Sequence, residues 1–274
     1  MSTEVTYRPD PADGLPAMRV NVWARRKHHY LDRYLDIFAG GMKNKWSRRV
    51  YIDLFAGPGR CVLEGTEEFV DGSPLIALRH PFTDHIYVDL EPSNTSALKT
   101  RCALAAKERF VTVIQGNCNE VVDQIVARIP RYSLACAFID PTNWQITFET
   151  VRRLSGVGRV DLLISFFGGM MKRVDHFADQ PRLDAFFGSH SWKDDPRYRT
   201  VEGRPSLGGY LACYRGQLET IGYQGQLSAR EIPVKNSKGA TMYLLTFASK
   251  HPLGYTFWDK ITTEDERGQL AVPW

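Results

Sequence analysis

Short, mostly apolar runs alternate along this chain with longer segments whose apolar residues recur every three or four positions. The runs lie at residues 50–54, 85–90, 111–115, 134–139 and 160–166. A strand that is covered on both faces reads as a continuous apolar run, so these five segments are predicted to be buried strands. Helical segments between them make each connection a right-handed crossover, which predicts a parallel sheet with helices on both faces.

The periodic segments predict the helices. We expect helices over residues 18–38, 73–78, 94–109, 120–129, 148–154 and 210–221. Gly40 and Gly41 end the first of them. At the start of the second, Ser73 is expected to be the N-cap and Pro74 the first helical residue.

The two ends of the chain follow other patterns. Residues 1–17 are rich in Pro, Asp and Gly, which is typical of a tail or an extended lead-in, and residues 18–274 are expected to form one domain. Within it, residues 168–210 read as an irregular insertion. Strands over 226–234 and 241–249, joined by the glycine-containing link 235–240, predict an antiparallel hairpin. The expected fold class is therefore α/β, with three layers and a mostly parallel seven-stranded sheet closed by that hairpin.

Composition narrows the classes of protein further. The 274 residues contain no apolar run long enough to span a membrane, and the first residues lack the basic start and apolar core of a signal peptide. Five scattered cysteines without a Cys-x-x-Cys pair argue against a disulfide framework and a structural zinc site, and favour a reducing cytoplasm. We find no convincing metal-ligand spacing and no Ser-His-Asp order.

The net charge of +4 is unevenly distributed. Residues 19–49 hold nine basic residues against Asp32 and Asp36. The basic residues are Arg19, Arg25, Arg26, Lys27, Arg33, Lys43, Lys45, Arg48 and Arg49. With aromatic residues interleaved, this block fits a nucleic-acid face, and the competing interpretation, which we favour slightly, is a solvated helix surface. Likewise, Lys27 and His28 either close over a site or belong to a surface helix.

Candidate chemistry gathers where the predicted strands end. Asp53, Asp89, Asn117 and Asp140 each stand at the end of a predicted parallel strand, the edge at which ligands of such sheets bind. After Asp53, the segment 55–59 (Phe-Ala-Gly-Pro-Gly) would let backbone approach a ligand closely. A nucleoside fits these positions.

Each position has an expected role in holding that nucleoside. Asp89, or failing it Glu91, would accept the ribose hydroxyls, and Asn117 would contact an adenine edge. Asp140 and Pro141 would face the reacting end.

These residues resemble the Rossmann-type S-adenosylmethionine-dependent methyltransferases. The resemblance rests on Asp-x-Phe-x-Gly-x-Gly, the acid after the second strand, and Asp-Pro followed by an aromatic residue, Trp144. It implies S-adenosylmethionine as cofactor, bound by Asp53, Phe55, Ala56, Gly57, Gly59, Ser73, Asp89, Glu91 and Asn117. An NAD site is the alternative, but the third glycine of Gly-x-Gly-x-x-Gly is missing.

A narrower resemblance is to the three-Cys-motif partner (TcmP) proteins. It is carried by segments 53–59, 71–75, 138–141 and 243–252 together with Trp258, which span nearly the whole chain. The family name implies a partner, a radical-enzyme-like three-Cys-motif protein of phage type. It does not settle a substrate.

The acceptor is suggested by methyltransferases that act on amines. In these relatives an Asp-Pro-Pro-Tyr-like segment holds the amine and the aromatic residue stacks on a flipped base. Residues 140–144 read Asp-Pro-Thr-Asn-Trp, with threonine in the place of the second proline and the aromatic residue one position later. We therefore expect Asp140, Pro141 and Trp144 to form the catalytic segment of a nucleic-acid amine methyltransferase from a bacterium or phage. The alternatives are a structural role for Asp140, and a partner protein that keeps the fold without turnover.

Overall fold

The computed structural model describes residues 5–167, 180–198, 206–224 and 229–263. Within these residues the main sheet has seven strands in the order β10-β11-β9-β8-β3-β6-β7. They are β3 (Arg49–Asp53), β6 (Asp84–Asp89), β7 (Val111–Gln115), β8 (Leu134–Ile139), β9 (Arg159–Phe167), β10 (Ile232–Lys235) and β11 (Thr241–Ala248). Only β11 runs against its neighbours. The strand order reverses at β3, so the crevice expected for a ligand lies at the carboxyl ends of β3 and β8.

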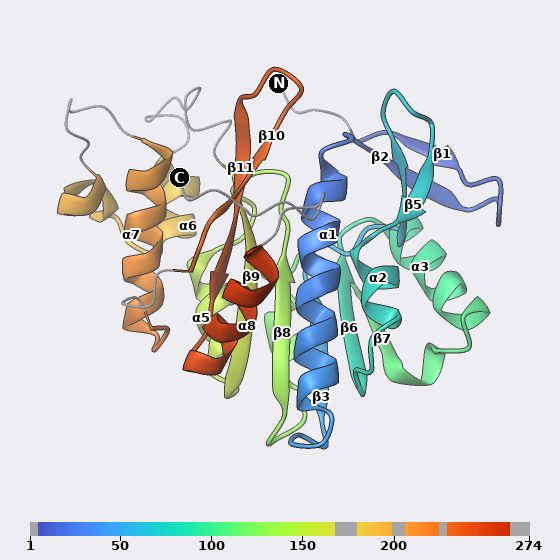
Figure 1. Ribbon diagram of the computed structural model, residues 1–274, viewed down its shortest axis with the longest axis horizontal. Helices are drawn as coiled ribbons and strands as arrows, with labels where there is room; N and C mark the ends of the chain where they lie inside the picture. The colour runs from blue at the N-terminus through green and yellow to red at the C-terminus, as the bar shows by residue number, and fades with distance from the viewer. Residues whose placement is uncertain (1–4, 168–179, 199–205, 225–228, 264–274) are drawn as a thin grey trace.

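Helices cover both faces of this sheet (Figure 1). One apolar cluster packs α1 (Ala24–Leu35), α2 (Ser73–Leu78), α3 (Pro92–Leu104) and α8 (Pro252–Thr262) against it. The other cluster packs α4 (Val122–Val126), α5 (Phe148–Ser155), α6 (Gln180–Phe187) and α7 (Leu207–Thr220) on the opposite face. The expected three-layer α/β fold, with its mostly parallel seven-stranded sheet and terminal hairpin, is confirmed.

A second, four-stranded sheet lies beside the first, at the upper right of Figure 1. It comprises β1 (Tyr7–Pro9), β2 (Pro16–Val20), β4 (Arg60–Leu63) and β5 (Phe69–Asp71). The parallel pairing of β2 with β4 joins the N-terminal residues to the strand that directly follows the glycine loop. We call these four strands the N-terminal sheet. From residue 5 on, the lead-in is thus extended, as one reading of the sequence held, but it is paired rather than a free tail.

Several predicted boundaries need correction. Residues 18–20 belong to β2, so α1 starts at Ala24, and it continues into a π-helical turn at Asp36–Gly40. The strands β4 and β5 were not predicted because three or four residues are too few to show a period. The helix α8 was also missed.

The predicted insertion at 168–210 lies partly outside the described residues. Its described part is not irregular, because it contains α6 and the start of α7. Aromatic side chains from both helices pack together, with the rings of Phe186 and Tyr214 stacked at 4.8 Å between centroids. This segment therefore contributes to the core on one face of the sheet. The first part of the strand predicted over 226–234 also lies outside the described residues.

Candidate active site

The glycine loop follows β3 and is fixed by backbone geometry. Gly57 and Gly59 have φ angles of +60° and +87°, a region that side chains other than glycine rarely adopt. A Cβ on Gly59 would lie 2.9 Å from Cδ1 of Leu98, so α3 leaves room for hydrogen only. The buried Ala56 donates its N–H to the carbonyl of Val88 at 2.9 Å, which ties the loop to β6. The predicted loop is therefore bound on two sides.

Asp53 ends β3 and is completely buried. Its carboxylate accepts hydrogen bonds from the N–H of Phe55 at 3.2 Å, the hydroxyl of Tyr51 at 3.1 Å, and Ser73. Burial raises the pKa of Asp53 to about 7, although these hydrogen bonds work in the opposite direction. Ser73 is not the N-cap of α2, because Gly72 takes that position and leaves the hydroxyl to Asp53. Ser73 thus supports the carboxylate that the sequence placed in the cofactor site.

Asp89 ends β6 and gathers three donors. It accepts hydrogen bonds from the N–H of Gly57 at 2.7 Å, the N–H of Glu91 at 2.9 Å and the side-chain amide of Asn94 at 3.0 Å. Asn94 also donates to the hydroxyl of Tyr7 from β1, at 3.1 Å. Sequence reasoning missed Asn94 and Tyr7, because neither belongs to a motif. Glu91 is exposed, at the start of α3.

Asn117 follows β7, and the structure brings it into a local turn. Its side-chain oxygen accepts the N–H of Asn119 at 3.0 Å. Asn119, which the sequence did not single out, carries more contacts. It donates to the carbonyl of Gln145 at 2.7 Å and accepts from Thr147 and Thr150. Asn119 thereby fixes the segment that follows Asp140.

The residues of the predicted acceptor segment differ in exposure, because Asp140 is partly exposed whereas Pro141 and Trp144 are buried. Asp140 follows β8 with its side chain 23% exposed, and it forms an ion pair with Lys27 of α1. Pro141 is buried. Trp144 is also buried in the core beneath α4 and α5, and its indole N–H has no hydrogen-bond partner among the described residues. As placed, Trp144 offers no exposed face on which a substrate ring could stack.

Lys27 is buried at the start of α1 rather than on a surface helix. Its ammonium lies between the Asp140 carboxylate and the ring of Tyr243, whose centroid is 5.5 Å away. Burial alone would lower the pKa of Lys27, but the charge of Asp140, helped by Tyr243 and the hydrogen bond, raises it. Because the partners are 113 residues apart in sequence, no local pattern could have revealed the pair.

The rim therefore has two parts. We call Asp53, Gly57, Gly59 and Asp89 the cofactor end, and Lys27, Asp140 and Tyr243 the acceptor end. The two are neighbours, since the charge of Asp140 contributes to the raised pKa of Asp53. Among the described residues, the side chain of Asn117 forms no hydrogen bond with either part.

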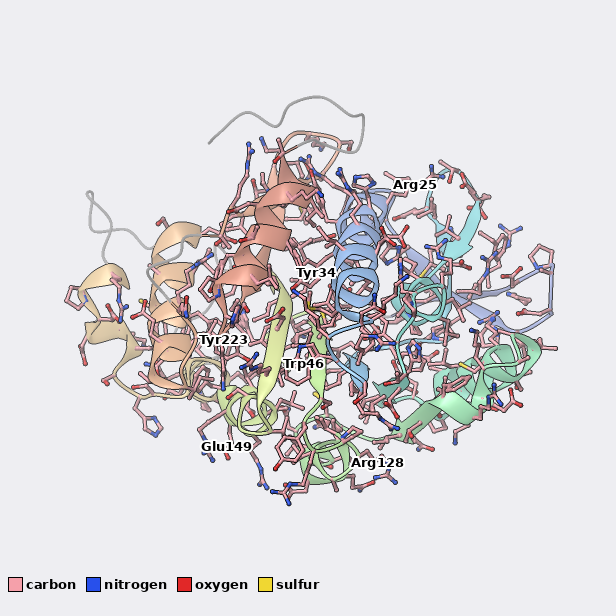
Figure 2. The ribbon with its side chains drawn as sticks, turned by 60° about the horizontal axis from the view of Figure 1, so that its bottom comes forward. Arg25, Tyr34, Trp46, Arg128, Glu149 and Tyr223 are labelled. Atoms are coloured by element: carbon pink, nitrogen blue, oxygen red, sulfur yellow. The ribbon has the colours of Figure 1, made fainter. Side chains whose placement is uncertain are left out.

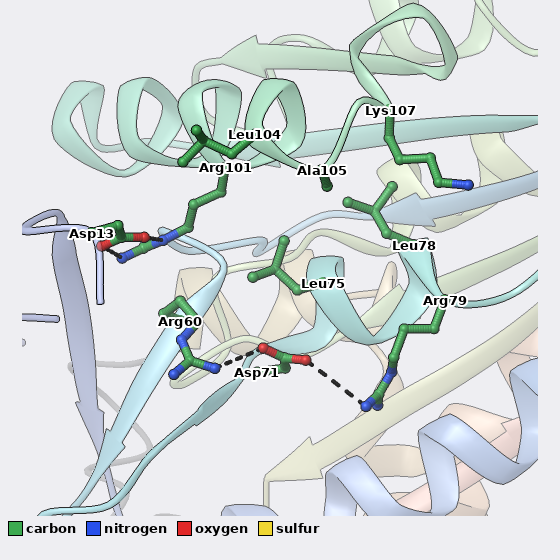
Figure 3. A pocket seen from close by; sticks show the side chains of 10 residues that line it. All are labelled: Asp13, Arg60, Asp71, Leu75, Leu78, Arg79, Arg101, Leu104, Ala105 and Lys107. Carbon is green, nitrogen blue, oxygen red and sulfur yellow. Dashed lines mark hydrogen bonds and ion pairs between the residues drawn. The ribbon is translucent and has the colours of Figure 1, made fainter. Parts of the chain in front are cut away.

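Arg101 of α3 supports the cofactor end from beneath. Its guanidinium donates to the carbonyl of Pro58, within the glycine loop, at 2.7 Å, and to the carbonyl of Pro16 at 2.8 Å. It also forms a two-pronged pair with the Asp13 carboxylate at 2.8 and 2.9 Å (Figure 3). The side chain is only 3% exposed. A cavity of about 420 Å³ lies beside this support, lined among others by Arg60, Asp71, Arg79 and Arg101, and it includes no cofactor-end residue.

The basic block over residues 19–49 does not form one continuous face. In Figure 2, Arg25 near the start of α1 and Trp46 beyond its end lie well apart. At least five of the nine basic side chains contact groups of the chain itself, among them Arg19, Arg25, Lys27, Arg48 and Arg49. Arg49, for example, binds the carbonyls of Trp46 and Pro81. This arrangement favours the structural account of much of the block.

Two further findings bear on the classes of site. In the part of the chain that the structure describes, three or more potential metal-binding side chains nowhere gather in one place. Within the same residues, every helix is too short or too polar to cross a membrane.

Comparisons with known proteins show the fold and nothing narrower. Protein LPL1258 from Legionella pneumophila has a similar structure, with a TM-score of 0.50 and 14% identity over 92% of this chain and 95% of the other. The methyltransferase domain of bacterial CtHen1 matches 80% of this chain and 98% of its own length at 14% identity, with a TM-score of 0.41. No protein-family model matches the chain, and no curated protein matches it.

Proposed function

We propose that the protein is an S-adenosylmethionine-dependent methyltransferase that methylates an amino group of a nucleic-acid base. The observation that carries the proposal is the hydrogen bond from Gly57 to Asp89, which joins the glycine loop to the acid of the next strand. Together they bring backbone N–H groups and a carboxylate to one edge of the sheet, at the point where the strand order reverses. The resemblance to three-Cys-motif partner proteins, with the implied radical-enzyme-like partner, belongs to the same proposal. So does a reducing cytoplasm, which suits five buried free thiols.

The residues of the cofactor end fit a nucleoside cofactor. An ionised carboxylate has about four acceptor positions, and Asp89 already uses three of them for protein donors. One position remains for a ribose hydroxyl. The second hydroxyl would then bind Glu91 or the side-chain oxygen of Asn94, which is buried and has no partner among the described residues. Asp53, Phe55, Ala56, Gly57, Gly59 and Ser73 would hold the methionine part, and Asn117 the adenine.

The bound cofactor would supply a methyl group already activated as a sulfonium. The protein's task is then mainly to align an amine with that methyl group. Asp140 and the carbonyl of Pro141 would accept hydrogen bonds from the amine. For Trp144 to stack on the base, its side chain would have to leave its present buried position.

Calorimetry with S-adenosylhomocysteine tests the cofactor site. Asp89→Ala removes a charged acceptor of three hydrogen bonds, so we expect its affinity to fall by at least about tenfold. Glu108→Ala, which removes an exposed acid elsewhere, is the matched control and should bind as the wild type does. Absence of binding to the folded wild-type protein at millimolar ligand would overturn the proposal.

A second candidate is a partner protein that binds the cofactor without turnover. The burial of Trp144 favours it, because the departure of residues 140–144 from the amine-binding pattern leaves no exposed aromatic face there. Labelled cofactor incubated with total RNA or DNA separates the two candidates. Transfer by the wild type that is abolished in Asp140→Ala would exclude the partner-only function.

A further inference from the structure

The proposed function gives no role to Lys27. This residue comes from α1, which lies across the sheet in Figure 1, and its ammonium meets the Asp140 carboxylate that follows β8. Tyr243 from β11 closes the other side of the ammonium. Three segments distant in the sequence thus converge on one charged pair at the proposed reacting end.

The groups beside this pair add little negative charge to it, and the neighbouring Arg26 and Arg79 add positive charge. Burial raises the pKa of Tyr243 and that of Cys61 each to about 12, so both are neutral at pH 7. Burial, with the neighbouring charge of Lys27, lowers the pKa of His28 to about 3, so this imidazole is neutral too. Asp53, with its pKa raised to about 7 by burial, carries at most part of a charge. The acceptor end is left with one carboxylate balanced by one ammonium.

Only one oxygen of the Asp140 carboxylate is engaged at the pair. Lys27 donates to Oδ2, and among the described residues Oδ1 accepts no hydrogen bond. The hydroxyl of Tyr243 is buried and has no partner among the described residues. One acceptor and one donor are therefore available beside a carboxylate whose orientation is already fixed.

We propose that Lys27 is a positioning residue that orients and neutralises Asp140, so that the acceptor end takes a neutral nitrogen, such as an aromatic exocyclic amine, and rejects an alkylammonium. The inference rests on the proposed methyl transfer and names the chemical class of its acceptor. An alkylamine is protonated at pH 7, and it would need a net negative site to bind and a base to lose its proton. The positive charge of Lys27 cancels the net negative charge of the site, and it also repels an alkylammonium.

The transfer balances with a neutral amine. The nitrogen attacks the methyl carbon, an N–C bond forms, and the S–C bond breaks with its electron pair passing to sulfur. The methylated nitrogen then gives one proton to Oδ1 of Asp140, from which it passes to water. Lys27 takes no part in these bonds and acts through the carboxylate.

The test compares Lys27→Met, Lys27→Arg and Lys45→Met. Lys45 is exposed beyond the far end of α1, so its variant removes the same charge outside the proposed site. Labelled cofactor is offered with a single-stranded oligonucleotide or with spermidine. We expect Lys27→Met to lower kcat on the oligonucleotide by about 100-fold, the loss expected from misplacing a reacting group by about 1 Å. Its affinity for S-adenosylhomocysteine should match that of Lys45→Met, and Lys27→Arg should regain part of the rate.

The outcomes separate this inference from the function beneath it. Wild-type protein that binds S-adenosylhomocysteine but methylates spermidine as readily as the oligonucleotide would overturn the inference alone. Equal rates for Lys27→Met and Lys45→Met would do the same. Wild-type protein that binds no S-adenosylhomocysteine overturns the proposed function and this inference together.

A second pair of variants covers the case in which Lys27→Met does not fold. In Asp140→Asn the Lys27 charge is uncompensated, whereas Lys27→Met/Asp140→Asn has a neutral pair whose amide oxygen still accepts from an amine. We expect the double variant to methylate the oligonucleotide about tenfold faster than Asp140→Asn, a difference of about 1.4 kcal/mol in the barrier. A double variant no faster than the single one would contradict the positioning role.

Discussion

The cofactor end and the acceptor end hold their polar groups in opposite ways. At the cofactor end, Asp89 accepts three hydrogen bonds and the buried Arg101 donates to three carbonyls and a carboxylate. At the acceptor end, Lys27 of α1 forms an ion pair with the Asp140 carboxylate. The hydroxyl of Tyr243 lacks a partner among the described residues. Ser165 of β9 lies opposite Asp140 when the β8–β9 register is continued by one residue. Its buried hydroxyl also lacks a partner among the described residues.

This difference indicates which end is complete before a ligand binds. Buried donors and acceptors without partners are costly, and they are rare in folded proteins unless a ligand or water satisfies them. The cofactor end is pre-organised, since nearly all its polar groups are satisfied by the chain itself. The acceptor end retains capacity for hydrogen bonds, which is what a substrate amine would use.

The strongest way to break the comparison is to remove the support beneath the cofactor end. Arg101→Met leaves the Asp13 carboxylate and the carbonyls of Pro16 and Pro58 without their donor. Because breaking a buried pair strands the other charge, we expect the free energy of unfolding to fall by about 3–5 kcal/mol. Urea denaturation measures it. Arg109→Met, at an exposed position five residues after α3, should stay within about 0.5 kcal/mol of the wild type. Equal losses in both variants would refute the supporting role.

The glycine loop gives the next largest expected effect. Gly59→Ala forces a side chain into the left-handed region and places its Cβ against Leu98, so we expect a loss of about 1–3 kcal/mol in unfolding free energy. Gly65 is the matched control, because its φ of +83° is nearly the same but no atom lies within 4 Å of its added Cβ. The difference between the two variants in thermal or urea unfolding isolates the contact with α3. If Gly65→Ala is as destabilising as Gly59→Ala, close packing does not shape the loop.

The sequence predicted those parts of this comparison that local pattern determines. The strands β7 and β8 were predicted to the residue, because short apolar runs bounded by polar residues and rich in β-branched side chains or flanked by turn signals have few other interpretations. The end of each strand then placed Asp53, Asp89 and Asp140 on one edge. The order of the strands and the position of these acids at their carboxyl ends together predict where the cofactor end lies.

The sequence did not reveal the residues that act between elements. Asn94, Arg101 and Asn119 belong to no motif, and their roles come from which carbonyls and carboxylates the fold brings near them. The pairing of Lys27 with Asp140 depends on how α1 crosses the sheet. Trp144 was assigned to the catalytic segment because it follows Asp140 closely in sequence. That spacing does not indicate whether its side chain is buried or exposed.

A pH titration sharpens the comparison at Asp53, the buried acid without an adjacent cation. Burial raises its pKa to about 7 from about 4 in the unfolded chain, so its contribution to stability is present at low pH and is lost as pH rises from about 4 to 7. Affinity for the cofactor's ammonium should change oppositely, rising until Asp53 is ionised near pH 7 and then levelling. Calorimetry with S-adenosylhomocysteine between pH 5 and 9 measures it, and Asp53→Asn should remove the rise. A rise that persists in Asp53→Asn assigns the titration to another group.

The smallest expected effect concerns the basic block, and it separates the acceptor end from the surface around it. If all nine basic residues contacted phosphates, the logarithm of the binding constant would fall with log salt at a slope of about −8. At least five of them already contact groups of the chain, so we expect a slope no steeper than about −4 for a short duplex. Fluorescence anisotropy between 50 and 200 mM salt measures the slope, and Lys43→Met, at an exposed position of the block, should make it shallower by at most about 1. A slope near −8 would mean that the internal pairs open on binding. A shallow slope places recognition on the few groups at the acceptor end, where a neutral amine and a fixed carboxylate meet.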